Sequence, residues 1–138
     1  MRLDHVAYAI RDPAATHRFY SEVLGLPLSQ AYAGDELMLI YDLPDGGSLV
    51  FSARRGETPR RAADETWTRQ HVGLTLRSHD DFEAWVHRLE RHGVRYQLIE
   101  DQRVYFADPD GRVIELEVAL PHTTDPDALG KLKDWLRG

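Results

Sequence analysis

Apolar and polar residues alternate along this chain in short runs, and helix-like spacing interrupts them. In the first third, residues 3–10, 27–33, 36–42 and 48–54 alternate with the two-residue period of a strand. After the first run, Asp12-Pro13 has the composition of a helix start, and helical spacing continues to Leu24 before Gly25. Residues 1–54 therefore predict one β-α-β-β-β module.

The second half of the chain repeats this order. Residues 70–77 read as a strand, Ser78 begins a helix that ends near Gly93, and strands follow at 94–99, 102–107 and 112–118. The strand His5-Val6-Ala7-Tyr8-Ala9-Ile10 has its counterpart in His71-Val72-Gly73-Leu74-Thr75-Leu76. We therefore expect a duplicated module at 69–119, a linker at 55–68, and an extension at 120–138 that contains an amphipathic helix from about 125 to 137.

The two faces of the repeated strands differ in side-chain size. Val6, Tyr8 and Ile10 share one face of the first strand, whereas His5, Ala7 and Ala9 share the other. The strand at 70–77 places His71, Gly73 and Thr75 together in the same way. We expect the bulky faces to pack under the helices and the small faces to line an open pocket. The fold class is thus α+β, with two modules forming a curved mixed sheet around a concave site.

Composition narrows the range of functions. The chain has 138 residues, a net charge of −6 and no cysteine. An acidic chain disfavours a general nucleic-acid surface, although Arg54-Arg55 and Arg60-Arg61 make a local basic stretch that reads as a solvated linker. No apolar run reaches the length of a membrane span, and no apolar signal-peptide core precedes the first strand. These features predict no membrane partner and a cytoplasmic location.

Two histidines and one carboxylate stand at positions that could hold a metal ion. His5 and His71 open the matched strands, and Glu115 lies on the last strand, on the face opposite the bulky residues. Two histidines and a carboxylate bind a divalent ion on one side and leave other positions open for substrate. Fe, Mn, Ni, Co and Zn all suit this set, and Glu117 is a rival ligand or a supporting group. The remaining histidines are interpreted as surface residues: His17, His79, His87, His92 and His122.

Several motifs together resemble a known family. They are the two histidine-opened modules, Phe19-Tyr20 followed by Leu24-Gly25-Leu26, and Asp108-Pro109-Asp110-Gly111 running into Ile114-Glu115-Leu116. With these motifs, residues 2 to about 120 resemble the vicinal oxygen chelate superfamily. That superfamily includes glyoxalase I, fosfomycin-resistance enzymes, extradiol dioxygenases, methylmalonyl-CoA epimerase and bleomycin-resistance proteins.

The resemblance assigns roles to individual residues. It implies His5, His71 and Glu115 as metal ligands, and Tyr105 as a catalytic tyrosine that faces the substrate. Glyoxalase I has a further carboxylate where this chain has Val50, which argues against that activity. The catalytic histidine of extradiol dioxygenases has no counterpart near residues 96–98, and the fosfomycin branch typically has threonine where Ala7 stands here. Gly73 and Arg103 complete the expected substrate pocket with Ala7 and Val50.

Two functional classes remain open after the residues of this chain are compared with those typical of the superfamily's branches. The first is an enzyme that needs one divalent metal and stabilises negative charge on a small oxygenated substrate, as a lyase, isomerase, transferase or dioxygenase. The alternative is a metal-free protein that sequesters a small molecule, as bleomycin-resistance proteins do. We further expect a homodimer, in which the metal site lies within one chain or is shared between two, with sharing favoured.

Overall fold

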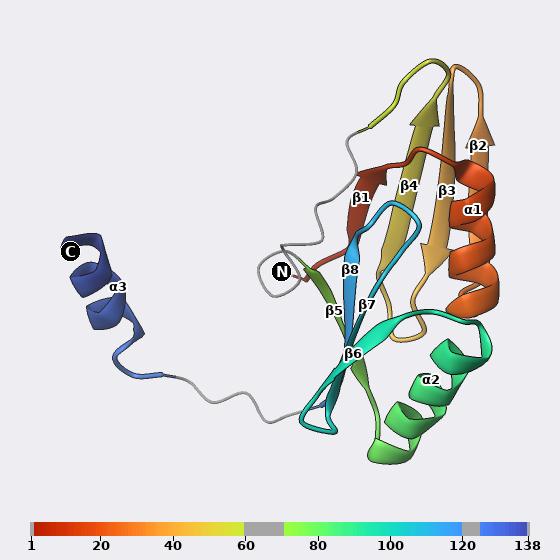
Figure 1. Ribbon diagram of the computed structural model, residues 1–138. Helices are drawn as coiled ribbons and strands as arrows, with labels where there is room; N and C mark the ends of the chain where they lie inside the picture. The colour runs from red at the N-terminus through yellow and green to blue at the C-terminus, as the bar shows by residue number, and fades with distance from the viewer. Residues whose placement is uncertain (1, 60–70, 120–124, 138) are drawn as a thin grey trace.

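A computed structural model of the chain describes residues 2–59, 71–119 and 125–137 (Figure 1). It contains two four-stranded sheets, one from each predicted module, and a separate C-terminal helix. The first module consists of β1 (His5–Ala9), α1 (Pro13–Arg18), η1 (Phe19–Val23), β2 (Leu28–Ala33), β3 (Glu36–Asp42) and β4 (Ser48–Arg54). The second consists of β5 (His71–Leu76), α2 (His79–Arg91), β6 (Tyr96–Ile99), β7 (Arg103–Ala107) and β8 (Val113–Val118), and α3 (Ala128–Arg137) follows it. The predicted α+β class is confirmed.

The two sheets have the same topology and the same register. Their strand orders are β1-β4-β3-β2 and β5-β8-β7-β6, and in each the first strand runs parallel to the last. Ala7 pairs with Val50 in the first sheet, and Gly73 pairs with Glu115 in the second. The sequence repeat is therefore a structural repeat, and Val50 and Glu115 occupy equivalent positions.

One hydrophobic core joins the two modules. In Figure 1, α1 and α2 lie on the same side of the sheets. The bulky side chains of the strands form one buried cluster with apolar side chains of the helices. The largest fully buried side chains of this core are Tyr20, Tyr41, Phe51, Phe106, Ile10, Leu89 and Val104. Because burying such side chains is the main favourable contribution to folding, the alternation seen in the sequence determines which sheet face becomes the core.

Both module helices begin with the predicted cap. Asp12 accepts a hydrogen bond from the Ala15 N–H at 3.0 Å, and Ser78 accepts one from the Asp81 N–H at 3.1 Å. The first helix differs from the expected single α-helix, because its last turn widens in η1, where the Leu24 N–H donates to the Phe19 carbonyl. Gly25 ends this helix with φ of +67°, a conformation that glycine adopts without strain.

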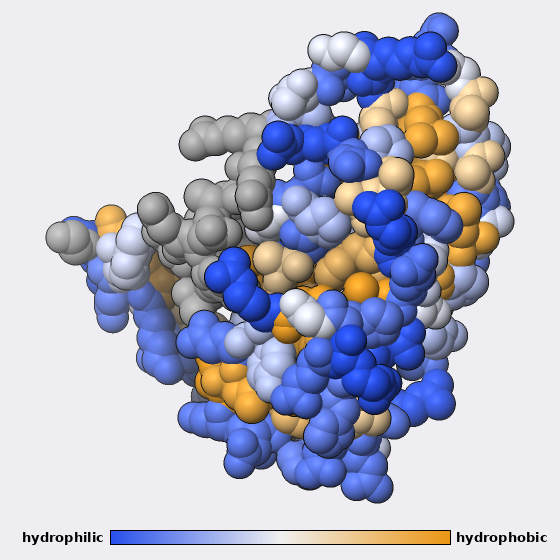
Figure 2. All heavy atoms as spheres, turned by 45° about the vertical axis from the view of Figure 1, so that its right-hand side comes forward, coloured by the Kyte–Doolittle hydropathy of each residue, from blue (hydrophilic) through white to orange (hydrophobic). Residues whose placement is uncertain are grey.

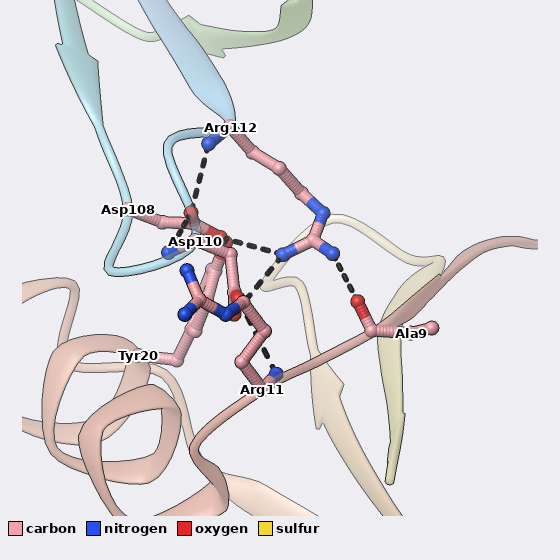
Figure 3. A network of polar contacts seen from close by, with 6 residues as sticks. All are labelled: Ala9, Arg11, Tyr20, Asp108, Asp110 and Arg112. Carbon is pink, nitrogen blue, oxygen red and sulfur yellow. Dashed lines mark hydrogen bonds and ion pairs between the residues drawn. The ribbon is translucent and has the colours of Figure 1, made fainter. Parts of the chain in front are cut away.

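A buried polar network ties the β7–β8 turn to the first module (Figure 3). The Asp108 carboxylate accepts hydrogen bonds from the Tyr20 hydroxyl at 2.8 Å and from the N–H groups of Asp110 and Arg112. The Arg112 guanidinium lies 3.4 Å from the Asp108 carboxylate and 3.4 Å from the Asp110 carboxylate. It also donates a hydrogen bond to the Ala9 carbonyl at the end of β1. This network fixes the start of β8, and therefore also the position of Glu115 three residues beyond Arg112.

The C-terminal helix lies apart from the sheets. Figure 1 shows α3 on the side of the molecule opposite α1 and α2. The predicted linker at 55–68 falls mainly outside the described residues, as does the beginning of the C-terminal extension. Among the helices that the structure describes, none has both the length and the apolar character needed to cross a membrane.

Candidate functional site

The open faces of β1 and β5 carry the predicted site residues. His5, Ala7 and Ala9 are exposed along β1, while Val6 and Tyr8 between them are half-buried. On β5 the exposed positions are His71, Gly73 and Thr75. The predicted division between a core face and an open face therefore holds in both modules.

His71 and Glu115 meet directly on the second sheet. The distance from His71 Nε2 to Glu115 Oε2 is 2.8 Å, and Glu115 is only 6 % exposed. Gly73 lies opposite Glu115 on the neighbouring strand, and a Cβ atom at this glycine would lie 4.0 Å from the carboxylate. The small side chain on β5 thus leaves space beside the carboxylate.

Tyr105 completes a compact group with these two residues. It pairs with Glu115 across β7 and β8, and its ring meets the His71 ring edge-on, with centroids 5.8 Å apart. Burial raises the pKa of Tyr105 above its usual value, and the hydrogen bond to Glu115 and the negative charge of that carboxylate raise it further. The hydroxyl therefore keeps its proton at neutral pH and can donate it in a hydrogen bond.

Arg103 adds a positive charge beside this group. Its Nε atom lies 3.7 Å from Glu115 and 3.5 Å from Glu117, so it bridges the two carboxylates. The arginine side chain remains 40 % exposed, which leaves it accessible from the solvent side. Glu117, the predicted rival ligand, is thus engaged by Arg103.

His5 lies in the other sheet and has a different neighbour. Its Nδ1 atom is 2.9 Å from Asp4 Oδ2, and the side chain is 55 % exposed. A carboxylate held by Nδ1 is a common way to orient a histidine whose Nε2 binds a metal. Within residues 2–59, 71–119 and 125–137, no group of three or more potential ligands lies close enough to surround one ion. A single chain brings together His71 and Glu115 but does not bring His5 to them.

The two equivalent sheet faces differ sharply in chemistry. The pair Tyr105–Glu115 of the second sheet corresponds to the pair Ile40–Val50 of the first. The pair Arg103–Glu117 corresponds in the same way to Met38–Ser52. The first module thus offers a largely apolar wall with one exposed histidine. The second module offers the charged and proton-bearing groups.

The residues present fit a divalent cation in part. Two ligand atoms bound side by side to one ion at about 2.0–2.2 Å lie about 3 Å apart, close to the separation of His71 Nε2 and Glu115 Oε2. A neutral imidazole and a carboxylate are also the ligand types that such ions prefer in a chain without cysteine. One histidine from outside this pair would complete the predicted set.

Two features of the site were missed from the sequence. Asp4 was not selected as a partner of His5, although an acid next to a candidate ligand is a usable signal. Tyr20 and Asp108 belonged to separate motifs, and their hydrogen bond depends on long-range packing that no local pattern shows. Of the histidines interpreted as surface residues, His17, His79, His87 and His92 are exposed; His122 lies outside the described residues.

A separate hollow of about 460 Å³ lies at the far end of the first sheet. Ile10, Pro13, Leu37 and Ala53 contribute apolar surface to it, and arginines 54 and 55 lie at its border. In the view of Figure 2, apolar side chains gather in the upper right part of the molecule, between hydrophilic ones. None of the predicted site residues lines this hollow.

Comparison with known proteins resolves the family. Residues 2–116 match the Glyoxalase/Bleomycin resistance protein/Dioxygenase superfamily. The chain belongs to this superfamily. It is 31 % identical over 119 residues to the glutathione transferase FosA of Serratia marcescens, covering 84 % of this chain and 79 % of that protein. It is also 28 % identical over 120 residues to the metallothiol transferase FosB of Staphylococcus haemolyticus, covering 83 % and 81 %.

Solved structures of the superfamily share the fold. A glyoxylase/bleomycin resistance protein/dioxygenase domain from Frankia sp. EAN1pec superimposes with a TM-score of 0.72 at 23 % identity, over 87 % of this chain and 98 % of that one. The fosfomycin resistance protein FosX of Listeria monocytogenes gives a TM-score of 0.66 at 15 % identity, over 86 % and 92 %. The match of residues 2–116 to the superfamily and the identity to FosA confirm the family resemblance predicted from the histidine-opened modules.

Proposed function

We propose that this chain is a divalent-metal-dependent enzyme that acts on a small oxygenated molecule. The observation that carries the proposal is the pair formed by His71 on the exposed face of β5 and Glu115 buried beside it on β8, with ligand atoms 2.8 Å apart. A histidine and a buried carboxylate held this close, with Tyr105 against both, form a group suited to chemistry rather than to packing.

We further propose that His5 of a second copy supplies the third ligand, so that the working form is a homodimer. His5 is exposed, and Asp4 engages its Nδ1 atom and leaves Nε2 available. The open faces of β1 and β5 expose small residues, so another chain can approach them closely. In such a dimer the apolar wall of one copy would face the charged group of the other.

The ion, when bound, would act as a Lewis acid on a substrate oxygen. Tyr105 would donate a hydrogen bond to the substrate oxygen that gains negative charge, because its proton is retained at neutral pH. Arg103 would attract an anionic group of the substrate, and its bridge to Glu115 and Glu117 holds its guanidinium in place. Val50 and Ala7 would contact apolar parts of the substrate.

Transfer of a thiol to an oxygenated small molecule is the reaction class that the relatives favour. The proteins named glutathione transferase and metallothiol transferase match more than four fifths of this chain. Glyoxalase I activity has less support, since Val50 stands where a second carboxylate is expected and Glu115 has no acidic counterpart in the first module.

Metal analysis of untagged protein tests the proposal. Wild-type protein purified without chelator should contain about one divalent ion per chain, and EDTA should lower its melting temperature. His71→Ala should lose the ion and this response to EDTA. His87→Ala is the matched control, because His87 lies exposed on α2 beside Glu90 and should bind metal like the wild type. A metal-free, fully folded wild-type protein would instead favour the sequestering function.

Mixed dimers test whether the ligands are shared. His5→Ala and Glu115→Ala chains each lack one ligand and should not bind the ion as pure dimers. When they are co-expressed and purified as a mixed dimer, His5 of the Glu115→Ala chain meets His71 and Glu115 of the His5→Ala chain, which restores one intact site. Metal content serves as the readout where no substrate is yet known. If the mixed dimer binds no more metal than either parent, His5 and Glu115 act within the same chain.

A further inference from the structure

The helix α3 presents a continuous apolar stripe to solvent. Leu129, Leu132, Trp135 and Leu136 have helical spacing and lie on one side of α3. Each of these side chains is exposed, with fractions from 52 % to 78 %, and no residue of α3 is buried. The stripe is therefore complete and uncovered.

A helix of this length needs a partner to be stable. Helices of about ten residues are marginal in water, and most of their stability in proteins comes from packing an apolar face. In the described parts of the chain, α3 makes no extensive contact with another element, and Figure 1 shows it standing away from both sheets. Its ion pairs, Lys131 with Asp125 and Arg137 with Asp134, are all local.

The body of the molecule exposes no comparable stripe of large apolar side chains in the described residues. Its other large exposed apolar side chains are scattered: Leu3 precedes β1, Leu28 and Tyr32 lie on β2, and Leu98 lies on β6. A second copy of the chain carries the same apolar stripe on its own α3 and can therefore supply a partner surface of equal size. Two copies of one surface can meet through a two-fold axis, where each supplies the same contacts.

The charges of this segment favour an antiparallel arrangement. Asp125 and Asp127 stand at its start, whereas Arg137 stands at its end and Lys133 within its second half. An antiparallel pair places the acidic start of each segment beside the basic end of the other and also opposes the two helix dipoles. Over residues 125–137 the three acidic and three basic side chains cancel, which gives an anionic membrane no electrostatic attraction.

We propose that α3 is a self-association element that packs antiparallel against α3 of a second copy of this chain. The apolar stripe offers on the order of 500 Å² per helix. Two helices would bury about 1,000 Å² in total, near the lower limit for a specific interface. The α3 pair therefore strengthens a dimer that has further contacts. It does so independently of metal binding, so its test and the metal test can fail separately.

Sedimentation of the full-length chain measures this contribution. Leu132→Asp places a charge in the middle of the stripe and should weaken dimerisation at least tenfold. Asp134→Ser, on the polar side of α3, is the control and should leave the dissociation constant within twofold of wild type. An unchanged constant in Leu132→Asp, or a wild-type chain that stays monomeric at every concentration, overturns the proposal.

Cross-linking tests the orientation, because the wild-type chain has no cysteine. Leu129→Cys and Leu136→Cys chains should form a mixed disulfide dimer with one another much faster than either forms one with itself. Faster self-cross-linking means a parallel pair, and no cross-linking means that α3 docks elsewhere. Binding of monomeric protein to phosphatidylserine vesicles assigns the stripe to membranes. Each of these three results contradicts the proposal.

Discussion

Replacing Tyr20 with phenylalanine isolates one of the polar links between the two modules. Tyr20 is 2 % exposed and donates to Asp108, itself 4 % exposed, at 2.8 Å. A buried hydrogen bond to a charged acceptor contributes about 1.5–3 kcal/mol. Asp108 keeps its bonds to two backbone N–H groups and its contact with Arg112, so we expect the lower part of this range, about 1.5–2 kcal/mol at pH 7.

The pH dependence of the same substitution gives a second measure. Burial, followed by the charge of Asp108, holds the pKa of Tyr20 well above its usual value of 10.0. Above pH 10 the unfolded chain releases this proton while the folded chain retains it, so the unfolding free energy of the wild type falls. Tyr20→Phe lacks this group. The difference in unfolding free energy between the wild type and Tyr20→Phe should therefore shrink by about 1.4 kcal/mol per pH unit above pH 10.

Urea denaturation followed by circular dichroism measures the loss of unfolding free energy in Tyr20→Phe at pH 7 and shows how far this loss has decreased at pH 11. Tyr32→Phe is the control, because Tyr32 is 57 % exposed and its hydroxyl donates to Gln30 at the surface. Its unfolding free energy should change by less than about 0.5 kcal/mol. A Tyr20→Phe protein as stable as the wild type at pH 7, or a difference that does not shrink at pH 11, would refute the reasoning.

Three further substitutions examine the fold and the site. Leu89→Ala empties a fully buried position in α2 and should cost about 2–5 kcal/mol in urea denaturation, and a loss below 1 kcal/mol would contradict the assigned core. Ser78→Ala removes the cap that accepts from Asp81 and should cost about 1 kcal/mol, whereas an unchanged stability would mean that water replaces the cap. Val50→Glu adds a half-buried carboxylate beside Ala7 and should lower the melting temperature of metal-free protein, with recovery on adding Mn²⁺ or Zn²⁺. The same melting temperature with and without metal in Val50→Glu would argue that position 50 does not face the ion.

Local pattern predicted most of the secondary structure. The strands at 36–42 and 48–54 match the structure to the residue, because alternation and the Pro44-Asp45-Gly46-Gly47 turn define both ends. The expected helix start at Asp12-Pro13 is also observed. The widened turn in η1 was not predicted, since apolar spacing cannot distinguish it from an ordinary helical end.

The site was predictable in its composition but not in its assembly. Strand parity placed His71, Gly73 and Glu115 on one face, and register brought them together as expected. Parity cannot say how one sheet is oriented toward another, so the sequence left open whether His5 joins the other two ligands within one chain or from a second chain, with sharing favoured. In a single chain the structure keeps His5 apart from His71 and Glu115. That relation depends on contacts between distant segments, such as the one between Tyr20 and Asp108.

The equivalent registers of the two sheets have a consequence for how this molecule can change. Ala7 with Val50 and Gly73 with Glu115 are the same backbone site filled with different chemistry. Under the proposed function, the apolar wall that contacts the substrate lies on the first sheet, and the charged group that reacts with it lies on the second. Substitutions at Met38, Ile40 and Val50 can then alter which molecules fit while the charged group stays intact. Duplication would thus have separated selectivity from reactivity within a single chain.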